Sequence, residues 1–308
     1  MADPDELPEH ILQALGLGPD VDLGFDFGMM NHPNINAEEP DELEDPDRHH
    51  GTNRRISLGR HYTKAFDTFT QTYSTVPEDL HIPQGTELIF SSRPADDPTL
   101  PWDQRKRVKD LYIPNTVKEI TIKGVHPLIC GKIKFARGST LKRIKSESFK
   151  LAGEEPIDLF FPESVKFFDE GAFHRDSRVK SVTICNPDAI IAPFAFAECI
   201  NLIKVFFVEV QKGNRNIQKY AFADCPNIER IYAPGVVKIG DYAFRRDPED
   251  KEKDYPIKQA WLEHVEDFGE DCFHRKIIEN LTIGEKNVDK VKSSAFATAQ
   301  IKRRYVQK

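Results

Sequence analysis

One six-residue phrase recurs through the second half of the chain, and each copy ends in phenylalanine. Ile239–Phe244 is a representative copy, with an apolar first residue, a polar middle and an alanine before the ring. The closing residues lie 22 to 29 positions apart and are Phe149, Phe173, Phe196, Phe222, Phe244, Phe273 and Phe296. A period in this range is typical of stacked repeats, in which no unit can bury its apolar face without its neighbours.

A strand pattern precedes many of these phrases. It has apolar residues at the first, fourth and sixth positions, as in Val179–Ile184 and Ile278–Ile283. A proline often follows and ends the strand, as at Pro162 and Pro234. We therefore expect an α/β repeat fold that is rich in β-structure, namely a solenoid of short parallel strands.

The unit from Ala221 to Phe244 resembles the BspA-like class of leucine-rich repeats almost throughout, and Ala195–Leu202 matches the start of the same unit. The resemblance covers about residues 108–308, which we take as the solenoid, with 56–107 as a degenerate N-terminal cap. A charged insertion at 245–254 departs from the pattern. The resemblance implies a leucine-rich-repeat solenoid that serves in adhesion and in binding other proteins, and not in catalysis.

Residues 1–55 form a leader of different composition. Positions 1–50 hold fourteen acidic residues and one basic residue, a balance of −13, whereas the remainder has 42 basic and 36 acidic residues, a balance of +6. We expect this leader to be mostly disordered, because it is poor in apolar residues. Residues 5–16 carry the start and stop signals of a short amphipathic helix. Its apolar residues form a predicted docking motif, Leu7, Ile11, Leu12 and Leu15. The alternative is a solvated tail with chance apolar residues.

The chain has the composition of a soluble protein, with a hydrophobic share of 39%. Its five cysteines form no Cys-x-x-Cys pair, and no stretch is long and apolar enough to span a bilayer. The first residues lack the basic and apolar segments of a classical secretory signal. We therefore expect a cytoplasmic protein without a disulfide framework. A surface-associated adhesin that is exported without a classical signal peptide is the alternative.

The sequence holds no motif of a hydrolase, a nucleotide-binding enzyme or a metalloprotease, so we expect no enzymatic activity and no cofactor. Cys199 and Cys225 occupy the same position in adjacent units, which we interpret as a small buried residue and not as a zinc site. Basic clusters occur at Arg105–Arg107 and Lys302–Arg304, but the balance of the body is only +6, so we interpret them as solvated charge and expect no nucleic-acid partner.

A row of side chains is the candidate site. In each strand the residue between the last two apolar positions points away from the core. Five of these eight positions are aromatic: Tyr112, Phe160, Phe206, Tyr232 and Trp261, the others being Lys134, Thr183 and Thr282. We expect this row to be exposed and to bind a protein partner, because aromatic residues dominate binding hot spots. The alternative is that cross-strand aromatic pairs only stabilise the sheet.

A second outward position lies two residues earlier in each strand and supplies a polar rim. It holds Lys132, Asp158, Ser181, Lys204, Arg230, Gln259 and Asn280, a set with a slight positive bias. Lys204 and Arg230 in particular would favour an acidic partner or the acidic leader itself. The expected function is therefore a protein–protein interaction scaffold, which holds a protein partner such as a cytoskeletal or other large assembly.

Overall fold

The computed structural model describes residues 62, 64–68, 79–91, 106–121, 124–125, 128–149, 156–208, 213–246, 255–292 and 294–307. The chain divides into two units, Met1–Ser57 and Leu58–Lys308, and every described residue belongs to the second. The predicted leader over 1–55 and its helix at 5–16 therefore lie outside the described residues.

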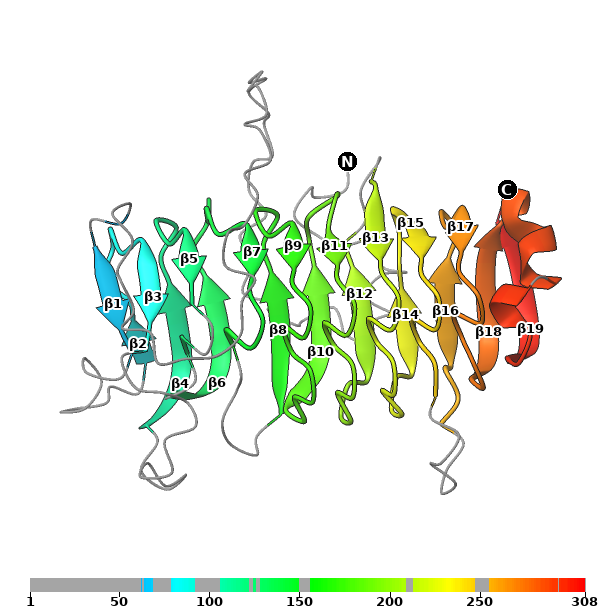
Figure 1. Ribbon diagram of the computed structural model, residues 1–308, viewed down its shortest axis with the longest axis horizontal. Helices are drawn as coiled ribbons and strands as arrows, with labels where there is room; N and C mark the ends of the chain where they lie inside the picture. The colour runs from blue at the N-terminus through cyan, green and yellow to red at the C-terminus, as the bar shows by residue number, and fades with distance from the viewer. Residues whose placement is uncertain are drawn as a thin grey trace, which may run out of the picture. The chain divides into compact units, whose positions relative to one another are not determined.

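The second unit is a parallel β-solenoid, in which successive coils add strands to two faces (Figure 1). We call the two sheets of one face the front sheets. The first has the order β2-β4-β6 and the second the order β19-β18-β16-β14-β12-β10-β8. Their strands are β2 (Asp79–His81), β4 (Lys106–Ile113), β6 (Leu128–Phe135), β8 (Ile157–Phe161), β10 (Val179–Ile184), β12 (Lys204–Phe207), β14 (Arg230–Tyr232), β16 (Gln259–Leu262), β18 (Ile277–Gly284) and β19 (Gln300–Gln307).

The back sheets lie on the other side of the core and have the orders β1-β3-β5 and β17-β15-β13-β11-β9-β7. Their strands are β1 (Ala65–Asp67), β3 (Leu88–Phe90), β5 (Glu119–Ile120), β7 (Arg143–Ile144), β9 (Phe167–Phe168), β11 (Ile190–Ile191), β13 (Arg215–Ile217), β15 (Val236–Ile239) and β17 (Asp267–Phe268). Strand pairing changes sheets between β6 and β8 on the front and between β5 and β7 on the back.

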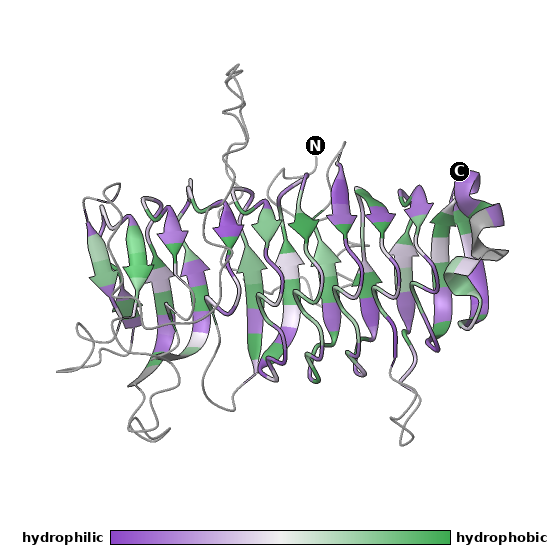
Figure 2. Cartoon of the chain, in the orientation of Figure 1, coloured by the Kyte–Doolittle hydropathy of each residue, from purple (hydrophilic) through white to green (hydrophobic). Residues whose placement is uncertain are grey.

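The prediction of a leucine-rich-repeat solenoid with short parallel strands is confirmed. The expected strand Val179–Ile184 coincides with β10. In the next two coils the same apolar pattern starts at Leu202 and at Ile228, and β12 and β14 begin two residues later. Helix is almost absent from the described residues, which hold only the 3₁₀ segments η2 (Glu285–Lys292) and η3 (Ser294–Phe296). Apolar and polar residues alternate along the front strands, as Figure 2 shows, because one side faces the core.

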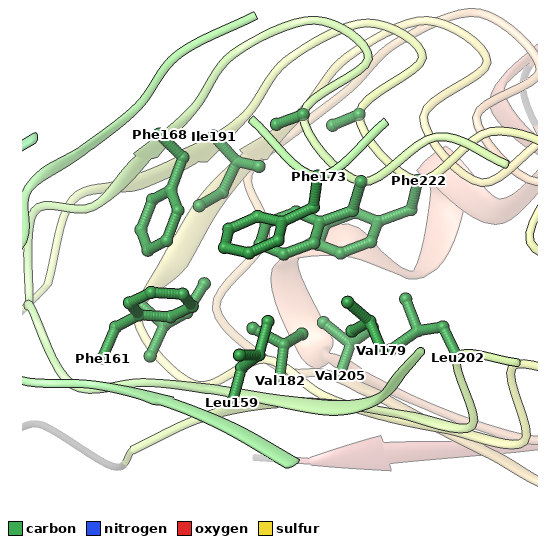
Figure 3. Close-up of a cluster of buried hydrophobic side chains, with 14 of the residues drawn as sticks. Leu159, Phe161, Phe168, Phe173, Val179, Val182, Ile191, Leu202, Val205 and Phe222 are labelled. Atoms are coloured by element: carbon green, nitrogen blue, oxygen red, sulfur yellow. The ribbon is translucent and has the colours of Figure 1, made fainter. Parts of the chain in front are cut away.

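The repeat phenylalanines form one continuous column in the core. Ring centroids of consecutive residues lie 6.2 Å apart for Phe149–Phe173 and 5.0 to 5.3 Å apart for each later pair up to Phe296. Figure 3 shows Phe173 and Phe222 in this column, facing front-strand residues such as Val182 and Val205. Neighbouring coils therefore share one apolar core, as the repeat period predicted.

The first six phenylalanines of the column, up to Phe273, each follow a tight turn whose second residue before the ring is left-handed. These residues are Glu147, Gly171, Phe194, Tyr220, Tyr242 and Asp271, with φ between 43° and 66°. Backbone bonds run from turn to turn, such as Phe196 N to Ala221 O at 2.8 Å. A left-handed residue with a Cβ costs roughly 1–2 kcal/mol, so the stacked turns must offset this strain.

Three buried cations link the coils through backbone carbonyl groups. Arg178 donates from Nη2 to Cys130 O at 2.5 Å, and Lys276 donates from Nζ to Cys225 O at 2.8 Å. Arg215 donates to Pro234 O at 2.6 Å and to Asn186 O at 2.8 Å, and burial lowers its pKa to about 10. A buried charge must be hydrogen-bonded, and here the main chain satisfies it.

Candidate interaction surface

The predicted row forms in register across the front sheets. Phe160 pairs with Thr183, Thr183 with Phe206, Phe206 with Tyr232, Tyr232 with Trp261, and Trp261 with Thr282. Tyr112 pairs with Lys134 in the N-terminal front sheet. The period of the repeat was sufficient to find these partners, because equivalent residues of successive coils must lie side by side. The change of sheet between β6 and β8 separates Lys134 from Phe160.

The row is less exposed than the sequence indicated. Phe206 lies outside the apolar core yet is only 5% exposed, whereas Tyr112, Phe160, Tyr232 and Trp261 are half-buried. The rings of Phe206 and Tyr232 stack at 5.0 Å, and Tyr232 meets Trp261 edge to face at 5.8 Å. Phe206 is therefore a buried member of the row that stacks on Tyr232, and Tyr232 and Trp261 are adjacent half-buried rings beside it.

The polar rim also forms in register. Ser181 pairs with Lys204, Lys204 with Arg230, and Arg230 with Gln259. Burial and the positive charge of Arg230 lower the pKa of Lys204. Two cations thus occupy neighbouring strands beside the aromatic row, while Ser181 Oγ donates to Asp158 at 2.6 Å.

In the N-terminal front sheet the row contains a lysine, Lys134, which bonds to neighbouring side chains. Lys134 Nζ lies 2.7 Å from Asp110 Oδ2 and 3.1 Å from the Tyr112 hydroxyl, and this ion pair lowers the pKa of Asp110. His81 stacks on Tyr112 at 4.1 Å. The row thus begins at His81 and ends at Tyr305, which pairs with Thr282. Sequence reasoning missed both, although the Leu80–Pro83 segment resembles a repeat strand.

Cys199 and Cys225 occupy core positions, as interpreted from the sequence. Cys199 and Cys225 are fully buried, and each thiol donates at 3.1 Å to a phenylalanine carbonyl of the preceding coil. Among the described residues, no group of three or more metal-ligating side chains comes together. The docking motif of Leu7, Ile11, Leu12 and Leu15 lies outside the described residues.

Parallel coils of two dozen residues, a phenylalanine column and an outward strand row define a repeat protein of the leucine-rich class. The sequence matches the BspA type leucine rich repeat region, in six copies, over residues 104–212, 129–251 and 190–302. The chain therefore belongs to this family, whose members are repeat proteins and typically not catalysts.

Several solved structures are similar to the chain. A leucine-rich repeat protein from Bacteroides ovatus shares 12% identity with a TM-score of 0.41, over 73% of this chain and 66% of that one. A leucine-rich repeat protein from Eubacterium ventriosum shares 10% identity with a TM-score of 0.35, over 74% and 73%. A leucine rich cell surface protein from Faecalibacterium prausnitzii shares 15% identity with a TM-score of 0.24, over 77% and 89%. The chain thus spans just under two thirds of the Bacteroides ovatus protein.

No curated protein matches the chain. The described part of the chain contains no helix with the length and apolar character needed to cross a membrane.

Proposed function

We propose that this protein is a non-catalytic scaffold that binds a protein partner on the front sheet, around Tyr232 and Trp261. The observation that carries the proposal is the unbroken row from Phe160 to Trp261, whose half-buried rings adjoin Lys204 and Arg230. Ordered aromatic rings offer a large contact area at low cost in conformational entropy, and such rings dominate binding hot spots. Phe206 supports this surface from the side, because its ring stacks on that of Tyr232.

The cations beside the row favour an acidic partner. Lys204 and Arg230 are paired residues of adjacent strands, so their like charges repel each other. A carboxylate of the partner between them would relieve that repulsion and speed association. We infer an acidic segment of a protein partner, such as a component of the cytoskeleton or of another large assembly.

A cytoplasmic location is part of the proposal. All five cysteines are free, and four of them are buried. Free thiols are usual in a reducing compartment. The exported adhesin is the competing proposal. Labelling intact source cells with a membrane-impermeant amine reagent separates the two, because only the adhesin would be labelled before lysis.

Two front-face variants of the full chain test the binding surface. The first is Tyr232→Ser with Trp261→Ser, and the second is Lys204→Glu with Arg230→Glu. Affinity capture from native lysate, read by mass spectrometry, should show the same protein lost from both variants. Phe206 is left unchanged because replacing this buried ring would cost stability.

A matched control places the same charge reversal on the back sheets. Arg143 and Lys238 are half-exposed cations in ion pairs with Asp169 and Asp267. The variant Arg143→Glu with Lys238→Glu should retain the partner. Capture at the wild-type level by both front-face variants, with circular dichroism showing folded protein, would rule the surface out.

A further inference from the structure

A second row of aromatic rings runs along the turns, away from the front-sheet row. Phe194, Tyr220 and Tyr242 occupy the left-handed turn position of three consecutive coils, with φ of 52° to 57°. Their rings stack almost in parallel, with centroids 5.2 Å apart for Phe194–Tyr220 and 5.5 Å apart for Tyr220–Tyr242. We call these three residues the turn ladder. Large residues in this strained conformation are unusual and often mark a functional site.

One end of the turn ladder is open. Gly171 holds the same turn position in the coil before Phe194, so this position contributes no side chain to stack on that side of the Phe194 ring. A Cβ built at Gly171 would meet only Ser146 Oγ at 3.5 Å and His174 Cβ at 3.8 Å, which are ordinary contacts. Phe194 is 37% exposed. A flat group can therefore stack on Phe194 over Gly171, at the spacing that the ladder already has.

The surroundings of the turn ladder are acidic. Across the coils, the ladder position and the residue before it carry five carboxylates and one ammonium group, from Glu147, Glu170, Lys219, Asp241, Glu270 and Asp271. The negative charge of Glu270 is the first cause of a raised pKa at Tyr242. These two turn positions are rich in carboxylates, in contrast to the cationic rim beside the front row, and they favour a cation.

The protein already places a guanidinium group on this ladder. The Arg245 guanidinium lies 5.3 Å from the centroid of the Tyr220 ring. Asp224 holds it there, with Arg245 Nη2 donating to Asp224 Oδ2 at 3.0 Å. A flat cation that stacks on a ladder ring and pairs with a carboxylate is therefore a contact that the turns support.

We propose that the open end of the turn ladder receives an arginine side chain from a basic protein partner. Its guanidinium stacks on Phe194 over Gly171 and pairs with the exposed carboxylate of Glu170. Arginine fits better than lysine, because the planar guanidinium both stacks and forms paired hydrogen bonds. This site is independent of the front surface and would let one scaffold hold an acidic and a basic partner together.

A local probe in the full chain tests the proposal. Para-fluorophenylalanine replaces Phe194, and the ¹⁹F resonance is followed during titration with a peptide of four arginines separated by glycines. The lysine peptide of the same length is the reference. We expect a saturable shift, with a midpoint roughly two- to fivefold lower for arginine than for lysine. Because the probe reports only position 194, binding of the peptide to the acidic residues 1–50 does not contribute.

Variants separate the site from charge alone. Gly171→Tyr should abolish the shift because the new ring extends the ladder into the open position, whereas Gly171→Ala should retain it. Glu170→Arg keeps the glycine of the turn and should weaken the shift. This variant tests the site if Gly171→Tyr does not fold. Trp261→Ser should change nothing, so failure of the front surface would not affect this result. Equal midpoints for the two peptides, or a full shift in Gly171→Tyr or Glu170→Arg, would overturn the proposal.

Discussion

Lys276 and Cys225 lie 51 positions apart in the sequence, yet Lys276 Nζ donates a 2.8 Å hydrogen bond to the Cys225 carbonyl. Arg178 makes the equivalent bond to Cys130 across 48 positions. Both cations follow a Phe-His-Arg segment. In regular coils the column phenylalanine is followed by Ala-x-Cys, as in Ala223–Cys225. Each cation reaches past a coil that lacks this pattern, namely the coil after Phe149 or the coil after Phe244. In regular coils a thiol bonds the preceding coil, as Cys225 does to Phe196. The buried cations therefore replace this link where the repeat is irregular.

Replacing Lys276 with methionine should lower the free energy of unfolding by about 1–3 kcal/mol, because the buried Cys225 carbonyl loses its donor. Methionine keeps most of the side-chain volume, so the loss reports the hydrogen bond. Urea unfolding monitored by circular dichroism measures it. Lys258→Met is the control, since its ion pair with Glu229 is exposed and should contribute less than about 1 kcal/mol. Equal effects of the two changes would show that the buried bond is not special.

The phenylalanine column predicts a dependence on position. Phe222 stacks on a ring at each side, whereas Phe296 is the last ring and has one stacked neighbour. Phe222→Ala should cost about 3–5 kcal/mol, and Phe296→Ala should cost less, because one coil interface is affected in place of two. Denaturant midpoints of the two variants compare them. A larger loss at Phe296 would contradict the stacked-coil account.

Two glycines should respond differently to alanine. A Cβ at Gly269 would lie 2.5 Å from the carbonyl carbon of Gly240, which is backbone of the neighbouring coil. Gly269→Ala must therefore separate two coils, and we expect a loss of about 1–3 kcal/mol or more. Gly171→Ala meets only ordinary contacts and pays for its φ of 66°, about 1–2 kcal/mol. Thermal unfolding should show the lower melting temperature for Gly269→Ala, and the reverse order would argue against this coil spacing.

The ion pair of Arg175 with Glu198 predicts an acid-dependent loss of stability. Hydrogen bonds from Arg175, and then from His174, hold the pKa of Glu198 below its ordinary value of 4.5. A lowered carboxyl pKa stabilises the fold above pH 4.5, and this contribution disappears as pH falls through the folded-state pKa. Glu198→Gln should thus be less stable than the wild type by under about 1 kcal/mol at pH 7, since the pair is exposed.

Unfolding curves at several pH values test this linkage. The difference between wild type and Glu198→Gln should shrink as the pH falls below 4.5. A difference that stays constant down to pH 3 would mean that the glutamate acts through packing and not through charge.

The repeat period predicted the parts of the molecule that successive coils share. Phe173, Phe196 and Phe222 stack, and Thr183 pairs with Phe206, because equivalent positions must coincide when coils stack. Exposure was harder to predict. The pattern places Phe206 on the outer face but does not show that Tyr232 covers its ring. Whether the row binds a partner stays a prediction.

Features that break the repeat were not predicted. No sequence pattern indicates that Lys276 and Arg178 are buried, because their partners are backbone carbonyl groups two coils away. The aromatic residues of the turn ladder can be seen in the sequence, because Phe194, Tyr220 and Tyr242 all occupy the fourth position of the six-residue phrase. Recognising it required the left-handed turn geometry, which brings these rings outward and into contact.

The change of sheet between β6 and β8 has a mechanical consequence. Strand-to-strand hydrogen bonding stops there, and the contacts that bridge the gap include Phe135 with Phe161 and the bond of Arg178 to Cys130. We expect a force applied along the stack of coils to separate neighbouring coils first at this point. The coils before it would then separate as a group, and the coils from β8 to β19 would stay joined to one another.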